Sequence, residues 1–213
     1  MNRLYTTLLL VLAAGCASTP EAQHPFPANS MAVTAHPLAT TAARDVLARG
    51  GNAADAAVAA GMMLAVVEPS MSHLGGRTQI LVRAPDGTYQ GYNGMTEVPA
   101  SYIAPDEPVS QGYGTIATPG VVAALGRLHA EHGTLSWSAL LQEPARVAAD
   151  GVALLPGAAA RHATGLELFS DKPGIQHTFI KEDGSTYAAG DVLKQPVLAD
   201  TIARLAAAGA DDC

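Results

Sequence analysis

Cysteine is nearly missing from this sequence: Cys16 and Cys213 are the only two in 213 residues. A bridge between them would tie a flexible arm to the far terminus, so we expect no disulfide. Charged residues are also scarce, at 15%, and 12 basic against 19 acidic residues give a formal net charge of −7. No run of basic residues occurs, which argues against a nucleic-acid partner.

Several catalytic signatures are absent too. The sequence has no GxSxG elbow, no phosphate-cradling glycine loop, no HExxH and no CxxC. Ser70, Ser72 and His73 are close in sequence, but adjacency alone does not make a Ser-His pair. His129 and His132 could share a helix face and bind a metal, although a helix C-terminus favours histidine anyway. We predict no cofactor and no metal site.

Small and apolar residues are what the sequence has in abundance. Alanine and glycine are frequent, aromatics make up 5% and apolar residues 48%, which is not a disordered composition. A chain of this length suits one domain, or part of a larger one, with a sizeable core. No internal repeat stands out.

The N-terminus reads as an export signal. Arg3 precedes an apolar run, Leu4–Ala14, which is too short to span a membrane. Small residues before Cys16 resemble the bacterial lipoprotein cleavage site, which implies a lipid anchor on Cys16. Ordinary signal cleavage and an uncleaved apolar start are the alternatives. Residues 17–30 form a polar, proline-punctuated tether, and the folded segment covers residues 31–213.

The stretch His36–Gly76 has the clearest local signals. It predicts a helix over Pro37–Arg49, with proline at the first position and Gly50 as the left-handed C-terminal cap. Asn52 caps a second helix, Ala53–Val67.

That second helix is almost wholly small or apolar, and Asp55 is its only charge. Asp55 lies three residues after Asn52, which predicts a capping box. A helix that is apolar all round is buried, and this one is too short for a bilayer, which needs about 20 apolar residues. We therefore predict a core helix packed on a sheet.

The remaining elements follow from alternation, caps and turn residues. Predicted strands cover 31–34, 78–84 and 88–93, and a Pro85-Asp86-Gly87 turn joins the last two into a hairpin with one face on the buried helix. Further helices are predicted for Pro119–His132 with Thr118 as cap, from Ser136 to Gly151 with a kink or new turn at Pro144, for 156–170, and for Pro196–Ala208.

The order of residues is more specific than these patterns. His36–Thr40 (HPLAT), residues 50–59 (GGNAADAAVA) and residues 67–76 (VEPSMSHLGG) resemble the opening of the γ-glutamyltransferase (γ-glutamyltranspeptidase) family. Residues 112–120 (GYGTIATPG) and 190–202 (GDVLKQPVLADTI) continue the resemblance, which covers about residues 31–211. One departure is His73, where the family usually has glycine.

The resemblance implies a fold and a reaction. The fold class is α/β (α+β), the N-terminal portion of the four-layer αββα sandwich of the N-terminal nucleophile hydrolases, incomplete here. The reaction is hydrolysis or transpeptidation of γ-glutamyl amides such as glutathione-like substrates. The nucleophile is a threonine that heads a newly made chain, because its free amine is the general base. In the family this threonine lies in a continuation beyond Gly209-Ala210-Asp211. We therefore expect no catalytic residue in this chain and no activity from it alone.

Substrate binding is where the sequence departs most from the family. There, an arginine shortly before an Ala-Pro pairs with the α-carboxylate of the γ-glutamyl group through two hydrogen bonds. Here the two possible registers put Met95 or Glu97 at that position. Methionine cannot pair with a carboxylate, and Glu97 would repel one. Three interpretations of Glu97 stay open. It is a solvated loop carboxylate without a role in binding, it indicates specificity for a cationic or neutral acyl group, or it indicates lost function.

Two functions stay open from the sequence. One is a γ-glutamyltransferase-family enzyme of the bacterial cell envelope, lipid-anchored on the periplasmic side or periplasmic, completed by a C-terminal or small-subunit segment. The other is a non-catalytic, truncated envelope lipoprotein or binding module derived from that family.

Overall fold

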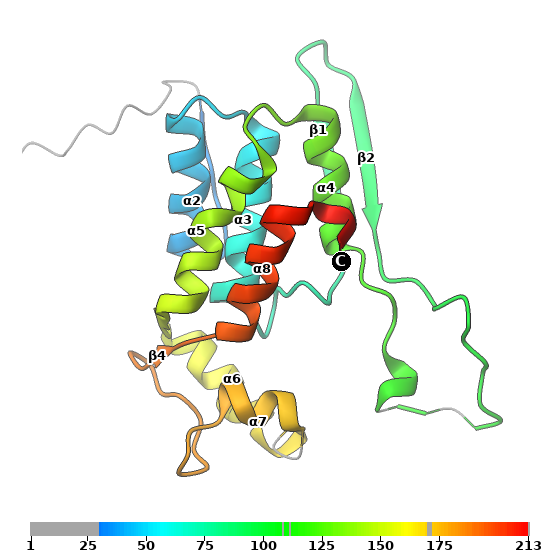
Figure 1. The fold of residues 1–213 in the computed structure, drawn as a ribbon, viewed down its shortest axis with the longest axis vertical. Helices are drawn as coiled ribbons and strands as arrows, with labels where there is room; N and C mark the ends of the chain where they lie inside the picture. The colour runs from blue at the N-terminus through cyan, green and yellow to red at the C-terminus, as the bar shows by residue number, and fades with distance from the viewer. Residues whose placement is uncertain (1–29, 108, 111, 170–171, 213) are drawn as a thin grey trace, which may run out of the picture.

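The computed structural model describes residues 30–107, 109–110, 112–169 and 172–212 (Figure 1). The predicted signal peptide, the tether up to residue 29, Cys16 and Cys213 lie outside the described residues. No helix within the described ranges has the length and apolar character needed to cross a membrane.

Helices dominate the structure. They are α2 (Pro37–Ala48), α3 (Ala53–Val67), α4 (Val121–His132), α5 (Trp137–Asp150), α6 (Pro156–Phe169), α7 (Pro173–Phe179) and α8 (Pro196–Ala208), with short 3₁₀ turns at Tyr113–Thr115 and Ala210–Asp212. The strands are β1 (Thr78–Arg83), β2 (Tyr89–Gly94), β3 (Val152–Ala153) and β4 (Val192–Leu193), which form two separate antiparallel pairs. The predicted ranges of α2, α3, the hairpin, α6 and α8 agree with these bounds to within one or two residues.

Helix α3 is the centre of the main core. Its Met62, Met63 and Val66 are fully or almost fully buried. The predicted capping box is present: the Asn52 side chain accepts from the amides of Ala54 and Asp55, and Asp55 accepts from the Asn52 amide. The prediction that α3 packs on a sheet was wrong for the described residues, because its main neighbours are α2, α4 and α5. An all-apolar surface serves equally well against other helices.

The β1–β2 hairpin packs mainly on α4 and not, as predicted, on α3. The two strands pair from Thr78 opposite Gly94 to Arg83 opposite Tyr89. At the open end of the hairpin, a Cβ on Gly120 would lie 2.4 Å from the Gly94 carbonyl oxygen. Only glycines allow these two backbones to approach so closely, and this contact fixes the hairpin against the start of α4.

Two further predictions need correction. Residues 31–34 are extended but form no strand, because no described strand lies beside them to pair with, and Met31 is 86% exposed. Helix α4 begins at Val121 with Gly120 as its N-cap, so Thr118 is not a cap and Pro119 is not the first helical residue. Thr118 instead exchanges two backbone hydrogen bonds with Glu97, and this extended pairing holds it out of the helix.

Helix α5 is continuous from Trp137 to Asp150 with Pro144 buried inside it, so Pro144 starts no new helix, and the predicted kink stays a prediction. Below this core, α6 and α7 form a smaller unit with the β3–β4 pair (Figure 1). Its own apolar cluster comprises Leu154, Ala158, Ala159 and Leu193, with Phe179 and Tyr187 against it. The Glu68–Gly76 loop lies where the main core meets this smaller unit, because Glu68 pairs with Arg161 of α6.

Candidate functional site

Met95 and Glu97 lie on the segment that leaves β2. The Glu97 amide donates to the Thr118 carbonyl at 3.1 Å, and the Thr118 amide donates to the Glu97 carbonyl at 2.8 Å. Both residues line a hollow of about 600 Å³ between β2, this bridge and one face of α4. The Glu97 side chain is exposed. The structure thus brings the two sequence-predicted positions to one surface, beside a backbone bridge that holds their spacing.

A carboxylate network occupies the other wall of the same hollow. Glu131 accepts from the Tyr92 hydroxyl at 2.7 Å and from the side-chain Nε2 of Gln90 at 2.5 Å, and its second oxygen pairs with Arg127. The bond from Tyr92, followed by that from Arg127, lowers the pKa of Glu131 to about 2. Burial, and then the bond to Glu131, raises the pKa of Tyr92 to about 12. Glu131 is therefore an ionised carboxylate that joins the hairpin to α4. Arg127 is the cationic side chain that lines this hollow.

The glycine-closed loop after α3 holds a second polar cluster. Glu68 ends α3 and is nearly buried, and its carboxylate pairs with Arg161 of α6. Arg161 also donates from Nε to the Ser70 hydroxyl at 3.0 Å. The ring of His73 folds back over Gly75 and Gly76. Among the described residues no hydrogen bond joins Ser70 to His73, so the structure gives no support to a Ser-His catalytic pair there.

Histidine side chains are used structurally elsewhere. His36 is the N-cap of α2, where its Nδ1 accepts from the Leu38 amide at 3.1 Å. Burial lowers the pKa of His36 in spite of the nearby Glu68 carboxylate, and this keeps the accepting nitrogen unprotonated. His129 contacts the Leu135 carbonyl and His132 contacts Gln90, so the two rings bind different partners. Within the described ranges, no three His, Cys, Asp or Glu side chains gather as a metal site would require.

Sequence reasoning missed Arg161 and the pair Arg127–Glu131. Arg161 lies on the helix predicted over residues 156–170, and its partners Glu68 and Ser70 come from a distant part of the chain. The i,i+4 spacing of Arg127 and Glu131 was visible in the sequence and could have indicated an ion pair. Local spacing could not indicate that Tyr92 and Gln90 also donate hydrogen bonds to Glu131.

Comparison with known proteins decides the family. A family model described as gamma-glutamyltranspeptidase matches residues 39–213. The chain belongs to the γ-glutamyltranspeptidase family. The match begins inside α2 and includes α3, the Glu68–Gly76 loop, the hairpin and the hollow at Met95 and Glu97.

Individual relatives agree with this assignment. The chain is similar to glutathione hydrolase 2 of Arabidopsis thaliana, with 32% identity over 78% of this chain and 29% of the relative. It is also 31% identical to the oxamate amidohydrolase proenzyme of Klebsiella pneumoniae, over 86% of this chain and 37% of that protein. The crystal structure of Helicobacter pylori γ-glutamyltranspeptidase superimposes with a TM-score of 0.80 and 28% identity, over 84% of this chain and 54% of that one.

These matches confirm the predicted fold class at partial coverage: a mixed helix and sheet portion of the γ-glutamyltranspeptidase type of N-terminal nucleophile hydrolase. The chain spans about 30% of the length of the first curated relatives that it matches. Family membership and the part of the fold are therefore established, whereas the activity of a whole family protein is a separate question.

Proposed function

We propose that this chain forms the N-terminal, large-subunit part of a cell-envelope enzyme that transfers or hydrolyses γ-glutamyl or related acyl groups. The collinear family match over residues 39–213 is the observation that carries the proposal. In the proposed reaction, a threonine hydroxyl supplied by a further segment attacks the γ-carbonyl carbon. The threonine's own amine takes the hydroxyl proton and passes it to the leaving amine as the amide C–N bond breaks, and a threonyl ester remains. Water or an amino acceptor then cleaves this ester.

In this reaction the chain provides a scaffold and part of the substrate surface. The core around α3 fixes α4, and Gly94 against Gly120 fixes the hairpin on α4. The hollow that carries Met95 and Glu97 is thereby held at a defined place. Binding surfaces of this kind accelerate a reaction by positioning the reacting bond, even when they supply no reacting group.

We propose that the group bound at this hollow is neutral or cationic. The exposed Glu97 carboxylate would repel an α-carboxylate, and the Arg127 guanidinium is already paired with Glu131. Relatives of the chain bear different substrate names, glutathione in one and oxamate in another, so the family does not share a single substrate. The proposed enzyme is therefore a γ-glutamyltransferase relative with altered head-group recognition.

The test is to express the chain alone and together with the remaining segment of a family polypeptide, and to measure hydrolysis of a γ-glutamyl anilide. The chain alone should give no turnover, and turnover by it would refute the proposal that the nucleophile lies elsewhere. The reconstituted protein should hydrolyse amides with a neutral or cationic head group.

Met95→Arg should improve KM for the γ-glutamyl substrate by about tenfold or more, since a charge-assisted pair contributes about 1.5–3 kcal/mol. Met95→Leu is the matched control and should change little.

The second candidate is a non-catalytic envelope lipoprotein or binding module of the same family. The replacement of the expected arginine by Met95 or Glu97 favours it. Complete inactivity of the reconstituted Met95→Arg protein, in a folded state, would favour this candidate over the enzyme.

For either candidate we propose export and a lipid anchor on Cys16. Cys16→Ser should then move the protein from the membrane fraction to the soluble periplasmic fraction, and an unchanged distribution would refute the anchor.

A further inference from the structure

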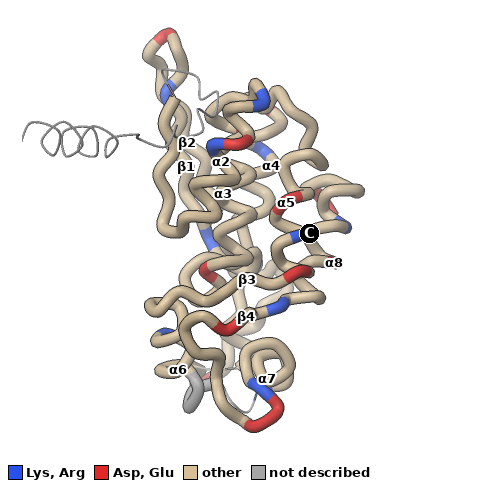
Figure 2. Tube along the Cα trace, turned by 90° about the vertical axis from the view of Figure 1, so that its left-hand side faces the viewer, with Lys and Arg blue, Asp and Glu red and all other residues tan. Residues whose placement is uncertain are grey.

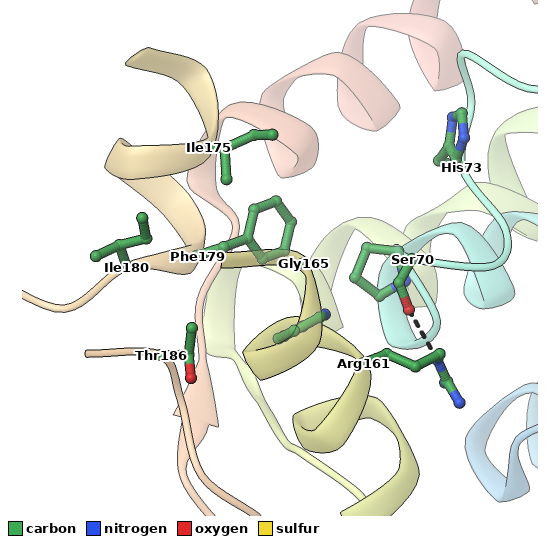
Figure 3. Close-up of a pocket in the computed structure, with 10 residues that line it drawn as sticks. Ser70, His73, Arg161, Gly165, Ile175, Phe179, Ile180 and Thr186 are labelled. Atoms are coloured by element: carbon green, nitrogen blue, oxygen red, sulfur yellow. Dashed lines mark hydrogen bonds between the residues drawn. The ribbon is translucent and has the colours of Figure 1, made fainter. Parts of the chain in front are cut away.

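A cavity of about 340 Å³ lies between the loop after α3 and the small unit formed by α6 and α7. Its apolar wall consists of Ile175, Phe179 and Ile180, and Figure 3 shows the ring of Phe179 pointing from its helix toward the loop that carries Ser70. Its polar rim consists of Ser70, His73 and Arg161. Small-molecule sites have this character: a mostly apolar hollow of about 300–1,000 Å³ with a few converging polar groups.

The polar rim is set up to donate hydrogen bonds. Ser70 accepts from Arg161 Nε at 3.0 Å, so its own hydroxyl proton can be donated to a ligand. Arg161 uses one terminal nitrogen on Glu68 and has further N–H groups at the other. The charges of Arg161 and Glu68 compensate each other, which removes any strong preference for a highly charged ligand. A carbonyl or carboxyl oxygen is the acceptor that fits these donors.

One buried nitrogen in the wall has no partner. His162 Nδ1 is inaccessible to solvent and makes no hydrogen bond within the described residues. The His162 ring lies edge-on to Phe179, with centroids 5.3 Å apart. Burial, and then the neighbouring Arg161, lowers the pKa of His162, so the ring is uncharged at neutral pH. The apolar end of the cavity is therefore neutral as well as aromatic.

A glycine forms part of the cavity wall. Gly165 lies inside α6 and lines the cavity. Glycine in a helix interior costs about 1 kcal/mol relative to alanine, so nothing in helix formation favours it there. Because Gly165 is one of the residues that line the cavity, a large side chain there is expected to take up part of the space.

We propose that this cavity binds a short acyl compound. The carbonyl oxygen of the ligand accepts hydrogen bonds from Ser70 and Arg161, and its aliphatic or aromatic body packs against Ile175 and Phe179. The site is independent of the proposed γ-glutamyl activity, because it requires neither the nucleophile nor the hollow at Met95 and Glu97.

The test is titration of the full chain with hexanoate, hexanamide and hexylamine, followed by calorimetry. Hexanoate or hexanamide should bind saturably, and hexylamine, which lacks the acceptor, should bind about tenfold more weakly or not at all. Tighter binding of hexanoate would identify the ligand as a carboxylate, and equal binding would identify the carbonyl as the recognised group. Absence of saturable binding, or equal binding of all three probes, would overturn the proposal.

Two variants locate the site. Gly165→Leu should fill the cavity and weaken binding by about tenfold or more. Gly174→Leu is the matched control, because Gly174 is an exposed α7 residue with open space at its Cβ position, and it should leave binding unchanged. Ser70→Ala removes one hydrogen bond and should weaken binding about fivefold while leaving the helical circular dichroism intact. If Gly165→Leu does not fold, Ser70→Ala decides: undiminished binding by it would place the ligand elsewhere.

Discussion

The helices around α3 and the hairpin region are built in opposite ways. In the helical core, Met62 and Met63 are buried and the only charge of α3, Asp55, is 0% exposed and fully hydrogen-bonded. In the hairpin region, which we define as β1, β2 and the described residues between 95 and 119, Leu81 is 72% exposed and Ile103 is 88% exposed. The segment from residue 95 runs away from the body of the molecule (Figure 1). The core encloses its own apolar surface, whereas the hairpin region leaves apolar surface uncovered.

This contrast fits the proposed assembly. Uncovered apolar side chains on a sheet are typical of a surface that another segment covers. In Figure 2, positions of basic and acidic residues are interspersed along the tube. We therefore expect the chain without a covering segment to self-associate through the hairpin region, while its core remains folded.

The largest effect is expected in the core, at Asp55. Its carboxylate accepts from the Thr134 hydroxyl at 2.6 Å, the Thr134 amide at 3.0 Å and the Asn52 amide at 3.0 Å. Asp55→Ala removes a buried acceptor that all of these donors share, and it should lower the free energy of unfolding by about 3 kcal/mol or more. Urea denaturation followed by circular dichroism measures this.

Asp86→Ala is the control for that substitution. Asp86 makes the same kind of bonds, to the amide and hydroxyl of Thr88, but in the exposed hairpin turn. Asp86→Ala should leave the urea midpoint nearly unchanged. An equal loss in both variants would show that burial of the carboxylate is not what distinguishes the core from the hairpin region.

Two neighbouring residues of β1 test the contrast within a single strand. Ile80 faces the main core and Leu81 faces away from it. Ile80→Lys should cost about 1–3 kcal/mol of stability, because it places a charge against apolar neighbours. Leu81→Lys should change stability by about 0.5 kcal/mol at most and reduce self-association in sedimentation velocity. Unchanged self-association of Leu81→Lys would show that the exposed face is not the one that associates.

The sequence predicted local features correctly in both regions, and the short range of the interactions explains why. The Asn52–Asp55 capping box and the start of α8 at Pro196 depend on residues within one turn of each other. The hairpin turn at Pro85-Asp86-Gly87 is equally local. Such features carry their own signal, whatever the rest of the chain does.

Long-range pairing carried no such signal. The Glu97–Thr118 bridge, the docking of the hairpin on α4 and the pairing of Glu68 with Arg161 join residues that local patterns cannot connect. The expected strand at 31–34 failed for the same reason: alternation predicts an extended segment but not a neighbouring strand. For the candidate site, the family resemblance located Met95 and Glu97, and only the structure placed Arg127 and Glu131 in the same hollow.

Acid should weaken the core through Asp55. Burial alone would raise the pKa of Asp55, but the bonds from Thr134, Asn52 and Leu135 outweigh it and hold the pKa below the ordinary 3.8. The stabilisation is therefore complete above pH 3.8 and is lost as the pH falls below that value toward the pKa of the folded state. Compared with Asp55→Asn, the wild-type chain should lose up to about 1.4 kcal/mol more per pH unit in this window. Parallel stability curves for the two proteins would contradict this prediction.

The smallest global effect is expected where the hairpin region joins α4, at Glu131. Glu131→Gln removes the charge that Tyr92, Gln90 and Arg127 share, so β2 should loosen from the helix. Amide hydrogen exchange in Tyr89–Gly94 should accelerate several-fold, whereas amides of α3 keep their protection, because local opening does not require the core to unfold. Arg127→Gln keeps the Tyr92 and Gln90 bonds to Glu131 and should accelerate exchange less. If protection fell equally in β2 and α3, hairpin and core would unfold as one unit, and the division of the molecule into two regions would be wrong.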